Sequence, residues 1–234
     1  MREAAVDEMS AAAQLAAFFK TSLRKIVPQR LLDERSIVIL LGPGAGGLYA
    51  RMQLLGAIGM NQKNSSAVPA NARSFLFVCF GNIMRSPMAD ALLKQAAEAA
   101  KIEIRSDSAG LHSTPGKAAH PWAQAAAIEM GISLANHQAK LLTPEAVEQV
   151  DAVFAMDLQN LAELLTLYPQ FKDKFFMLSA YSGDPRLREI SDPYLGDLET
   201  TRQCCRVLKT CVQNLLASRT DSVVAPKEVK MHRG

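Results

Sequence analysis

Beyond about residue 73 the chain alternates short apolar runs with helical segments, and this alternation constrains its fold more than any other feature. The runs typical of strands are residues 75–80, 102–105, 152–156 and 175–178. The segments typical of helices begin near residue 86 and cover about 123–130, 158–167 and 198–217. Strands that alternate with helices favour a parallel sheet, because parallel strands need a crossover between them. The predicted fold is therefore α/β, a parallel sheet with helices on both faces.

Two helix ends carry local signals that support this segmentation. Thr143 precedes Pro144 and Glu145, which is typical of an N-cap followed by proline at the first helical position. Gly131 follows the helix that is expected to end at Met130, a position where glycine commonly ends helices.

A polar, small-residue and proline-containing stretch at residues 61–72 divides the chain and is typical of a linker. We predict an N-terminal extension of unknown function over 1–60, the linker over 61–72, an α/β domain over 73–221 and a flexible C-terminal tail over 222–234. With 234 residues, of which 49% are hydrophobic, the chain can form one such domain and a smaller appendage.

The extension is expected to be mainly helical. Residues 4–26 are rich in alanine, and Leu15, Phe18, Phe19 and Leu23 recur at helical spacing beside basic side chains. Docking on the α/β domain or on a partner protein is the simpler interpretation, and a weak contact with an anionic membrane surface is the alternative.

A glycine-rich run in the extension has the spacing of a dinucleotide-binding fingerprint. It covers residues 42–47 and follows an apolar run at 36–41. That fingerprint also needs an acidic residue about 20 positions further on, yet no Asp or Glu occurs between Glu34 and Asp90. We therefore predict a glycine-rich turn between packed segments and no nucleotide cofactor.

Charge and cysteine content favour a cytoplasmic protein that does not bind nucleic acid. The net charge is only +3, and Lys and Arg exceed Asp and Glu by eight to five over residues 1–72 but are balanced afterwards. No apolar stretch reaches the roughly 18 residues of a membrane span. Cys79 stands alone and the other three cysteines cluster at 204–211, which is no disulfide or zinc pattern.

The strongest chemical signal is the segment between the predicted strand at 75–80 and the following helix. Five residues separate Cys79 from Arg85, enough to curl the backbone so that its N–H groups point inward at an anion. Gly81 and Asn82 suit the unusual dihedral angles of such a turn, and Pro87 is tolerated early in the helix. We call residues 79–86 the anion loop. The residues expected to bind a phosphate here are Phe80, Gly81, Asn82, Ile83, Met84 and Ser86.

The side chains of this segment suggest covalent chemistry on a phosphate. Donors that hold an anion also stabilise a thiolate, so Cys79 is expected to be nucleophilic at neutral pH. Arg85 supplies a planar fork for two phosphate oxygens, and the Ser86 hydroxyl can donate to the sulfur. A buried cysteine near an arginine is also common without any function. The surrounding Gly-Asn-x-x-Arg-Ser-Pro pattern favours the functional interpretation.

Hydrolysis through a thiol intermediate also needs a general acid, which can later act as the base. The best candidate is Asp192 in Ser-Asp-Pro-Tyr, where Pro193 stiffens the loop and Tyr194 could line the entrance to the site. Asp-Pro-Tyr is by itself an ordinary turn signal. Phe80, Leu111, His112 and Tyr194 are expected at the pocket rim, where they would favour an aryl phosphate.

These residues resemble the low-molecular-weight protein tyrosine phosphatases. The resemblance rests on Cys-Phe-Gly-Asn-Ile-Met-Arg-Ser-Pro from Cys79, Ser-Ala-Gly from Ser108, the stretches at 131–143 and 151–157, and Asp-Pro-Tyr from Asp192. It covers roughly residues 73–218. The resemblance implies a four-stranded parallel sheet, protein phosphotyrosine as substrate, and neither metal nor cofactor. It also implies that Cys79 is the nucleophile, Arg85 the phosphate clamp and Asp192 the general acid and base, with His137 joining Asn82 and Ser86 in a network beneath the loop.

Two departures from the family pattern are informative. Met84 stands where many members have a second loop cysteine, so protection by a disulfide within the loop is not expected. The segment after Ser-Ala-Gly, which begins at Leu111, is short and lacks an aromatic residue. It resembles the bacterial branch associated with tyrosine kinases of polysaccharide export, which makes such a kinase a candidate substrate.

Two other functions remain open from the sequence. A thiol-coupled arsenate reductase uses the same kind of loop and would need the cysteines at 204, 205 and 211 as a redox relay. A non-catalytic module could bind phosphotyrosine or another anion without turnover.

Overall fold

The computed structural model describes residues 44–54 and 68–224. The chain divides into two compact units, Met1–Arg51 and Met52–Gly234. Residues 44–54 are helical, in line with the expected helical extension, but Gly44, Gly46 and Gly47 lie inside this helix. The predicted turn is therefore wrong for these glycines, because a helix-favouring run of residues follows them and glycine tolerates a helix at a modest cost. Residues 4–26 and Gly42 lie outside the described residues.

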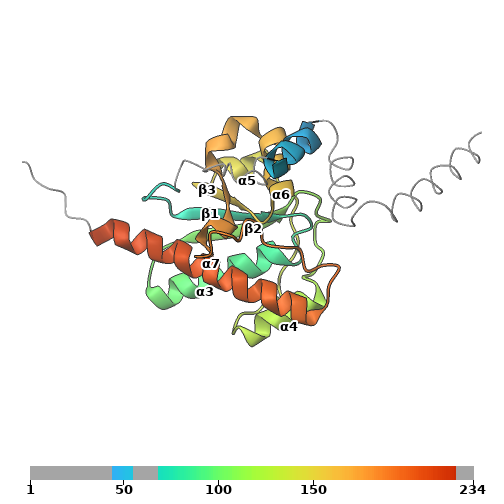
Figure 1. The fold of residues 1–234 in the computed structure, drawn as a ribbon. Helices are drawn as coiled ribbons and strands as arrows, with labels where there is room; N and C mark the ends of the chain where they lie inside the picture. Colours follow the sequence, from blue (N-terminus) through green and yellow to red (C-terminus); the bar gives the residue numbers. More distant parts are fainter. Residues whose placement is uncertain (1–43, 55–67, 225–234) are drawn as a thin grey trace, which may run out of the picture. The chain divides into compact units, whose positions relative to one another are not determined.

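The sheet has the predicted four parallel strands, shown in Figure 1. They are β1 (Ser74–Cys79), β2 (Arg105–Gly110), β3 (Ala152–Ala155) and β4 (Phe175–Met177), in the order β2-β1-β3-β4. Val78 of β1 pairs with Ala109 on one side and with Ala155 on the other. The carboxyl ends of the three strands therefore meet at one edge, where ligands of open α/β sheets bind.

The predicted position of β2 was wrong. The strand was expected at 102–105 from its isoleucines, but it begins at Arg105 and runs through Ser106, Asp107 and Ser108. β2 is an edge strand and its first half is partly exposed, so polar side chains are tolerated there. Ile102 and Ile104 instead pack against the core from the preceding turn.

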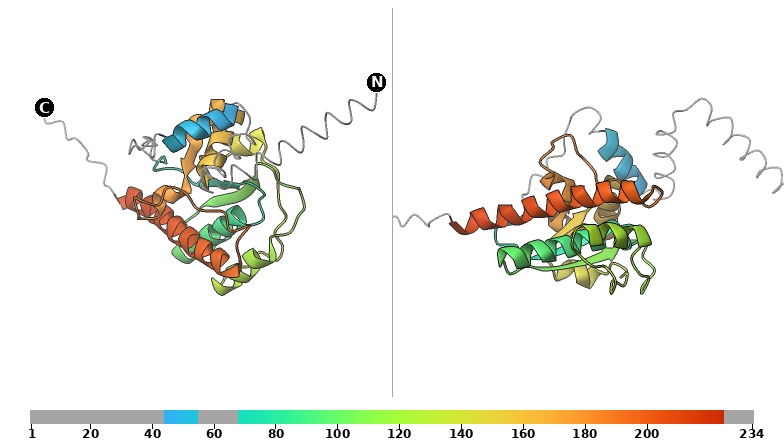
Figure 2. Two further views of the ribbon diagram at one scale, coloured as in Figure 1. Left: turned by 45° about the vertical axis from the view of Figure 1, so that its right-hand side comes forward. Right: turned by 90° about the horizontal axis from the view of Figure 1, so that it is seen from below.

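Helices cover both faces of the sheet, as Figures 1 and 2 show. One face carries α3 (Arg85–Ala100), α4 (Pro121–Glu129) and α7 (Leu198–Val224), and the other carries α5 (Pro144–Glu148) and α6 (Leu158–Leu167). Short 3-10 helices, η1 (Pro169–Lys174) and η2 (Leu178–Tyr181), flank β4. Thr143 caps α5 as predicted, because its hydroxyl accepts a hydrogen bond from the Ala146 N–H at 3.3 Å.

The core lies on both sides of β1 and β3. The rings of Phe77 and Phe154 stack with centroids 5.6 Å apart, and Phe75 packs on the same Phe154 ring at 5.9 Å. From α7, Leu208 and Leu215 are fully buried on the α3 side. These contacts fix the direction of β1, and therefore the point at which Cys79 leaves the sheet.

The described end of the predicted linker is packed. Val68 and Ala72 are buried, and Arg219 of α7 donates to the carbonyl oxygens of Val68 and Pro69 at 3.1 and 2.6 Å. The boundaries predicted for the extension, linker and domain stay predictions.

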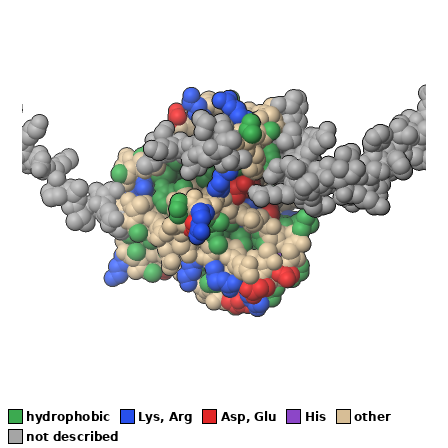
Figure 3. Space-filling model, in the orientation of Figure 1, with side chains coloured by type: hydrophobic (Ala, Val, Ile, Leu, Met, Phe, Trp, Pro, Cys, Tyr) green, Lys and Arg blue, Asp and Glu red, His purple; other side chains and the backbone are tan. Residues whose placement is uncertain are grey.

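Among residues 44–54 and 68–224, no helix combines the length and apolar character needed to cross a bilayer. On the face in Figure 3, basic and acidic side chains of the coloured part are interspersed and do not form one large basic patch.

Candidate active site

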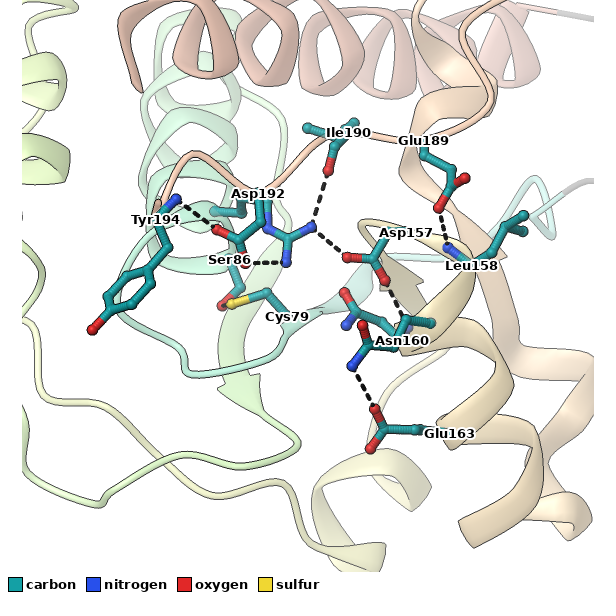
Figure 4. Close-up of polar contacts among 12 residues, drawn as sticks. Cys79, Ser86, Asp157, Leu158, Asn160, Glu163, Glu189, Ile190, Asp192 and Tyr194 are labelled. Carbon is teal, nitrogen blue, oxygen red and sulfur yellow. Dashed lines mark hydrogen bonds and ion pairs between the residues drawn. The ribbon is translucent and has the colours of Figure 1, made fainter. Parts of the chain in front are cut away.

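The anion loop joins the end of β1 to the start of α3. The Cys79 sulfur receives the Asn82 backbone N–H at 3.3 Å and lies 3.0 Å from the Ser86 hydroxyl oxygen, beside which Figure 4 draws it. Within the part of the chain that the structure describes, no side chain caps the first turn of α3, a helix of 16 residues. Its N–H groups and the positive end of its dipole therefore remain available to an anion at the loop.

Asn82 holds the loop in shape. Its φ of 53° lies in the left-handed region that the sequence predicted, and its side chain is fully buried. The amide donates to Ser86 and Ser108 hydroxyl oxygens at 2.9 Å each and accepts the Lys140 N–H at 2.8 Å. Because Ser86 accepts from Asn82, its one proton is free to point toward the sulfur or toward the Ala109 carbonyl, 3.3 Å away.

His137 supports the loop from below, where the family resemblance had suggested it. Its Nε2 lies 2.7 Å from the Asn82 carbonyl oxygen. A carbonyl oxygen only accepts, so this nitrogen carries a proton. The structure thus brings Asn82, Ser86 and His137 together and adds Ser108, which sequence reasoning had placed only in a family motif.

Gly110 allows β2 to approach the anion loop. A Cβ at this position would lie 2.8 Å from the Asn82 nitrogen and 2.9 Å from both the Gly81 carbonyl carbon and the Phe80 oxygen. All three are backbone atoms, which have little freedom to move away. The Ser-Ala-Gly motif was the only sequence signal for this close contact.

Arg85 connects the loop to two carboxylates, those of Asp157 and Asp192. Its Nη1 donates to Asp157 at 2.6 Å and to the Ile190 carbonyl at 3.0 Å, and its Nη2 donates to Asp192 at 2.5 Å. Burial acts to lower the pKa of Arg85, but the charges of Asp157, Asp192 and Cys79 outweigh it, so the pKa is raised. The buried Nε has no hydrogen-bond partner in the described residues, which leaves one donor for an anion.

Asp157 is a site residue that sequence reasoning missed. It is the N-cap of α6, where one carboxylate oxygen accepts the Asn160 N–H at 2.7 Å while the other accepts Arg85. Its position after β3, next to β1 in the sheet, was the available signal, because neighbouring parallel strands end at the same edge.

Asp192 and Tyr194 lie on the loop before α7. Asp192 is held by Arg85 and by the Tyr194 backbone N–H at 3.1 Å, but its side chain keeps 39% exposure. The ring of Tyr194 meets His120 edge-on at 5.7 Å, and His120 meets Trp122 in the same way at 5.1 Å. The backbone N–H of His120 also donates to the Ile83 carbonyl at 2.9 Å, which connects the rings of His120, Trp122 and Tyr194 to the anion loop.

A cavity of about 220 Å³ opens above the sulfur. Its lining comprises Cys79, Phe80, Gly81, Ile83, Met84, His112, Thr114, Lys117, Asp192 and Tyr194. We call His112, Thr114, Lys117 and Tyr194 the rim; sequence reasoning missed Thr114 and Lys117. Leu111, expected at the rim, is buried instead and does not line the cavity, because its N–H is bound to the Cys79 carbonyl at 3.0 Å.

His112 is fixed on both sides. Its ring lies 4.5 Å from that of Phe80, and its Nε2 is 2.5 Å from a carboxylate oxygen of Glu163, a buried residue of α6. This pair links α6 to the cavity wall.

The remaining cysteines lie on α7 and are buried. Burial raises the pKa of Cys204 and Cys211 to about 12 and that of Cys205 to about 11. These thiols therefore stay protonated at neutral pH. Within the described residues, no three His, Cys, Asp or Glu side chains are grouped to hold a metal ion.

Comparison with known proteins agrees with this geometry. The family model for low molecular weight phosphotyrosine protein phosphatases matches residues 74–227. The chain belongs to this family.

The relatives of this phosphatase differ in their named substrates. A protein-arginine-phosphatase of Bacillus subtilis is 34% identical over 140 residues, 60% of this chain and 92% of the relative. The low molecular weight protein-tyrosine-phosphatase YfkJ of the same organism is 34% identical over 151 residues, 62% of this chain and 94% of the relative. A structure of YwlE arginine phosphatase, whose cysteine-to-serine variant carries a phosphorylated active-site serine, has a TM-score of 0.60, 31% identity and coverage of 63% and 95%.

Proposed function

We propose that this phosphatase hydrolyses protein phosphotyrosine through a phosphocysteine intermediate. The main supporting observation is that Cys79 and Asp192, far apart in sequence, line one small cavity, while the buried Arg85 is paired with Asp192. In the first step the Cys79 thiolate attacks phosphorus, the bond to the tyrosyl oxygen breaks, and Asp192 gives that oxygen its proton. In the second step Asp192 takes a proton from water, the water oxygen bonds to phosphorus, and the sulfur leaves as thiolate.

Three features support phosphate binding above the sulfur. The Asn82 N–H points at the sulfur, and within the described residues the first turn of α3 has no side-chain cap and the buried Arg85 Nε has no partner. A phosphate oxygen would satisfy that donor, and the guanidinium would neutralise the charge that develops in the transition state. The phosphorylated serine in the YwlE variant supports attack by the residue at this position.

Asp157 has a positioning role in this proposal. By occupying Nη1, it holds the guanidinium in the orientation in which Nη2 contacts Asp192, a residue of the cavity lining. A bound phosphate would compete with Asp192 for Nη2.

The cavity favours an aryl ester over a phosphorylated arginine. Phe80, Ile83, Met84 and Tyr194 give it apolar and aromatic walls. Among the described residues Asp192 is the only carboxylate in the lining and is assigned to proton transfer, so the guanidinium of a phosphoarginine would have no carboxylate partner of its own there. We extend the proposal to the bacterial setting: a cytoplasmic enzyme whose substrates include a tyrosine kinase of polysaccharide export.

Turnover of a chromogenic aryl phosphate by the full chain tests this proposal. Cys79→Ser should abolish turnover, whereas Cys211→Ser, the same exchange in the core of α7, should leave activity per folded molecule unchanged. Asp192→Ala should slow turnover strongly, and aryl phosphates should be preferred to alkyl phosphates and to phosphoarginine. Full activity in Cys79→Ser would overturn the assignment.

The alternative functions are less well supported. Arsenate reduction would need reactive thiols near Cys79, yet the α7 thiols are buried with raised pKa values. Thioredoxin-dependent arsenate reduction by the full chain would reverse this judgement. A non-catalytic binding module would not need an acid beside the thiol. Tight phosphotyrosine binding without product release would support such a module.

A further inference from the structure

We propose that Lys117 recognises an acidic residue that lies next to the phosphotyrosine in the substrate, and so selects acidic phosphopeptides. This inference rests on the proposed function, because it assigns a specificity to the same cavity. Among the described residues, Lys117 is the one lysine in the lining of that cavity.

Two other Lys and Arg side chains near the anion loop already have carboxylate partners. Arg85 is paired with Asp157 and Asp192. Lys140 lies 2.7 Å from both carboxylate oxygens of Asp107. Lys117, in contrast, is exposed, and no carboxylate of the described residues lies within ion-pair distance of it. Its charge is therefore available to a ligand.

The backbone around Lys117 is held in place relative to the anion loop. Gly116 donates to the Ala139 carbonyl and Ala139 donates to the Lys117 carbonyl, both at 2.8 Å. The Ser113 hydroxyl donates to the Gly81 carbonyl at 3.1 Å. Gly116 has a φ of 81°, which lets the chain turn between these anchors. The ammonium group is thus presented from a fixed point on the rim.

The position of Lys117 fits a flanking carboxylate better than the phosphate itself. The phosphate would lie deep in the cavity, between Cys79, the loop amides and the buried Arg85. Lys117 belongs to the exposed rim, where the peptide on either side of the phosphotyrosine would pass. A single exposed ion pair is worth little, so the expected preference is about two- to fivefold in kcat/KM and weakens with salt.

The test compares phosphotyrosine peptides that carry Glu or Gln in turn at each position close to the phosphotyrosine. We expect the full chain to prefer one or more Glu peptides, Lys117→Ala to remove the preference and Lys117→Glu to reverse it. Lys172→Ala removes an exposed lysine of η1 outside the lining and should keep the preference. Lys172→Ala should also keep the KM for a small aryl phosphate, and in Lys117→Ala that KM should change less than the KM for the preferred Glu peptide.

Two results would overturn the proposal. One is that the full chain shows no preference for Glu peptides, or that Lys117→Ala keeps this preference. The other is an equal rise in KM for the small aryl phosphate and the peptides in Lys117→Ala, which would place the ammonium on the phosphate. Equilibrium binding of the same peptides to the Cys79→Ser variant gives the preference without turnover. If the full chain does not hydrolyse these peptides, the proposed function is wrong. If the Cys79→Ser variant binds the Glu and Gln peptides equally, the role proposed for Lys117 is wrong.

Discussion

In the anion loop, Asn82, Arg85 and Ser86 are each at most 1% exposed, whereas Tyr194 on the rim is 47% exposed and the adjacent Leu195 is 93% exposed. Each buried residue has several partners that restrict it. Apart from His112, the rim has fewer contacts: Tyr194 packs on the His120 ring, and Lys117 makes no ion pair with the described residues. The difference suggests that substitutions in the loop change kcat, and that those on the rim change the choice of substrate. The following predictions test this division.

Arg85→Lys should have the largest effect. Lysine keeps the charge but loses the planar fork that contacts both aspartates, so we expect kcat for an aryl phosphate to fall about 10²- to 10³-fold. Arg202→Lys, on the exposed pair with Glu129, is the matched control and should leave kcat unchanged. Steady-state kinetics of both variants would check this, and near-normal kcat in Arg85→Lys would contradict the clamp.

Gly110→Ala should come next. The added methyl would press on the backbone of residues 80–82 and move the loop amides, for which a loss of about 100-fold in kcat is reasonable. Gly183→Ala is the control, because its φ of 79° also makes alanine strained while the residue lies outside the cavity lining. Both variants should lose thermal stability, but only Gly110→Ala should lose kcat. If Gly110→Ala and Gly183→Ala had the same kcat, the loop would tolerate this displacement.

Asn82→Gly should have an intermediate effect. Glycine accepts the left-handed φ, so the exchange removes mainly the amide that binds Ser86, Ser108 and the Lys140 N–H. We expect a drop of about tenfold in kcat together with a lower unfolding temperature, since buried partners lose their hydrogen bonds. Rapid-quench and melting experiments would measure the two effects. A change in KM alone would argue against a role in holding the loop.

Tyr194→Ala on the rim should have the smallest effect. Loss of an aromatic wall should raise KM for aryl phosphates about two- to tenfold and leave kcat nearly constant. Leu195→Ala, next to it but outside the lining, should change neither value. If Tyr194→Ala lowered kcat as strongly as Asn82→Gly, the division between loop and rim would fail.

Local sequence patterns predicted the part of the site that is continuous in the chain. β1, the anion loop and α3 follow one another, so Cys79 and Arg85 could be placed from spacing alone. α6 was predicted with its observed bounds, Leu158–Leu167, and its apolar residues Leu158, Leu161 and Leu164 are buried. The need for a general acid pointed to Asp192, and resemblance to the family supplied the role of His137.

The missed features depend on contacts between distant segments. Asp157 and Gly110 matter because β3 and β2 flank β1, which no local pattern specifies. Leu111 is buried where its backbone N–H donates to the Cys79 carbonyl. Lys117 lies on the rim, where its carbonyl accepts the Ala139 N–H. β2 was misplaced because an edge strand can carry polar residues that local propensity assigns to a loop.

The central claim is that phosphate passes through the sulfur of Cys79, and trapping that intermediate tests it most directly. In Asp192→Ala, an aryl phosphate with a good leaving group needs little help from an acid, while hydrolysis of the intermediate loses its base. Acid quench during turnover, followed by mass spectrometry, should therefore find one phosphoryl group on the peptide that contains Cys79. Continued turnover with no phosphorylated peptide, or with the phosphoryl group on another residue, would contradict the account.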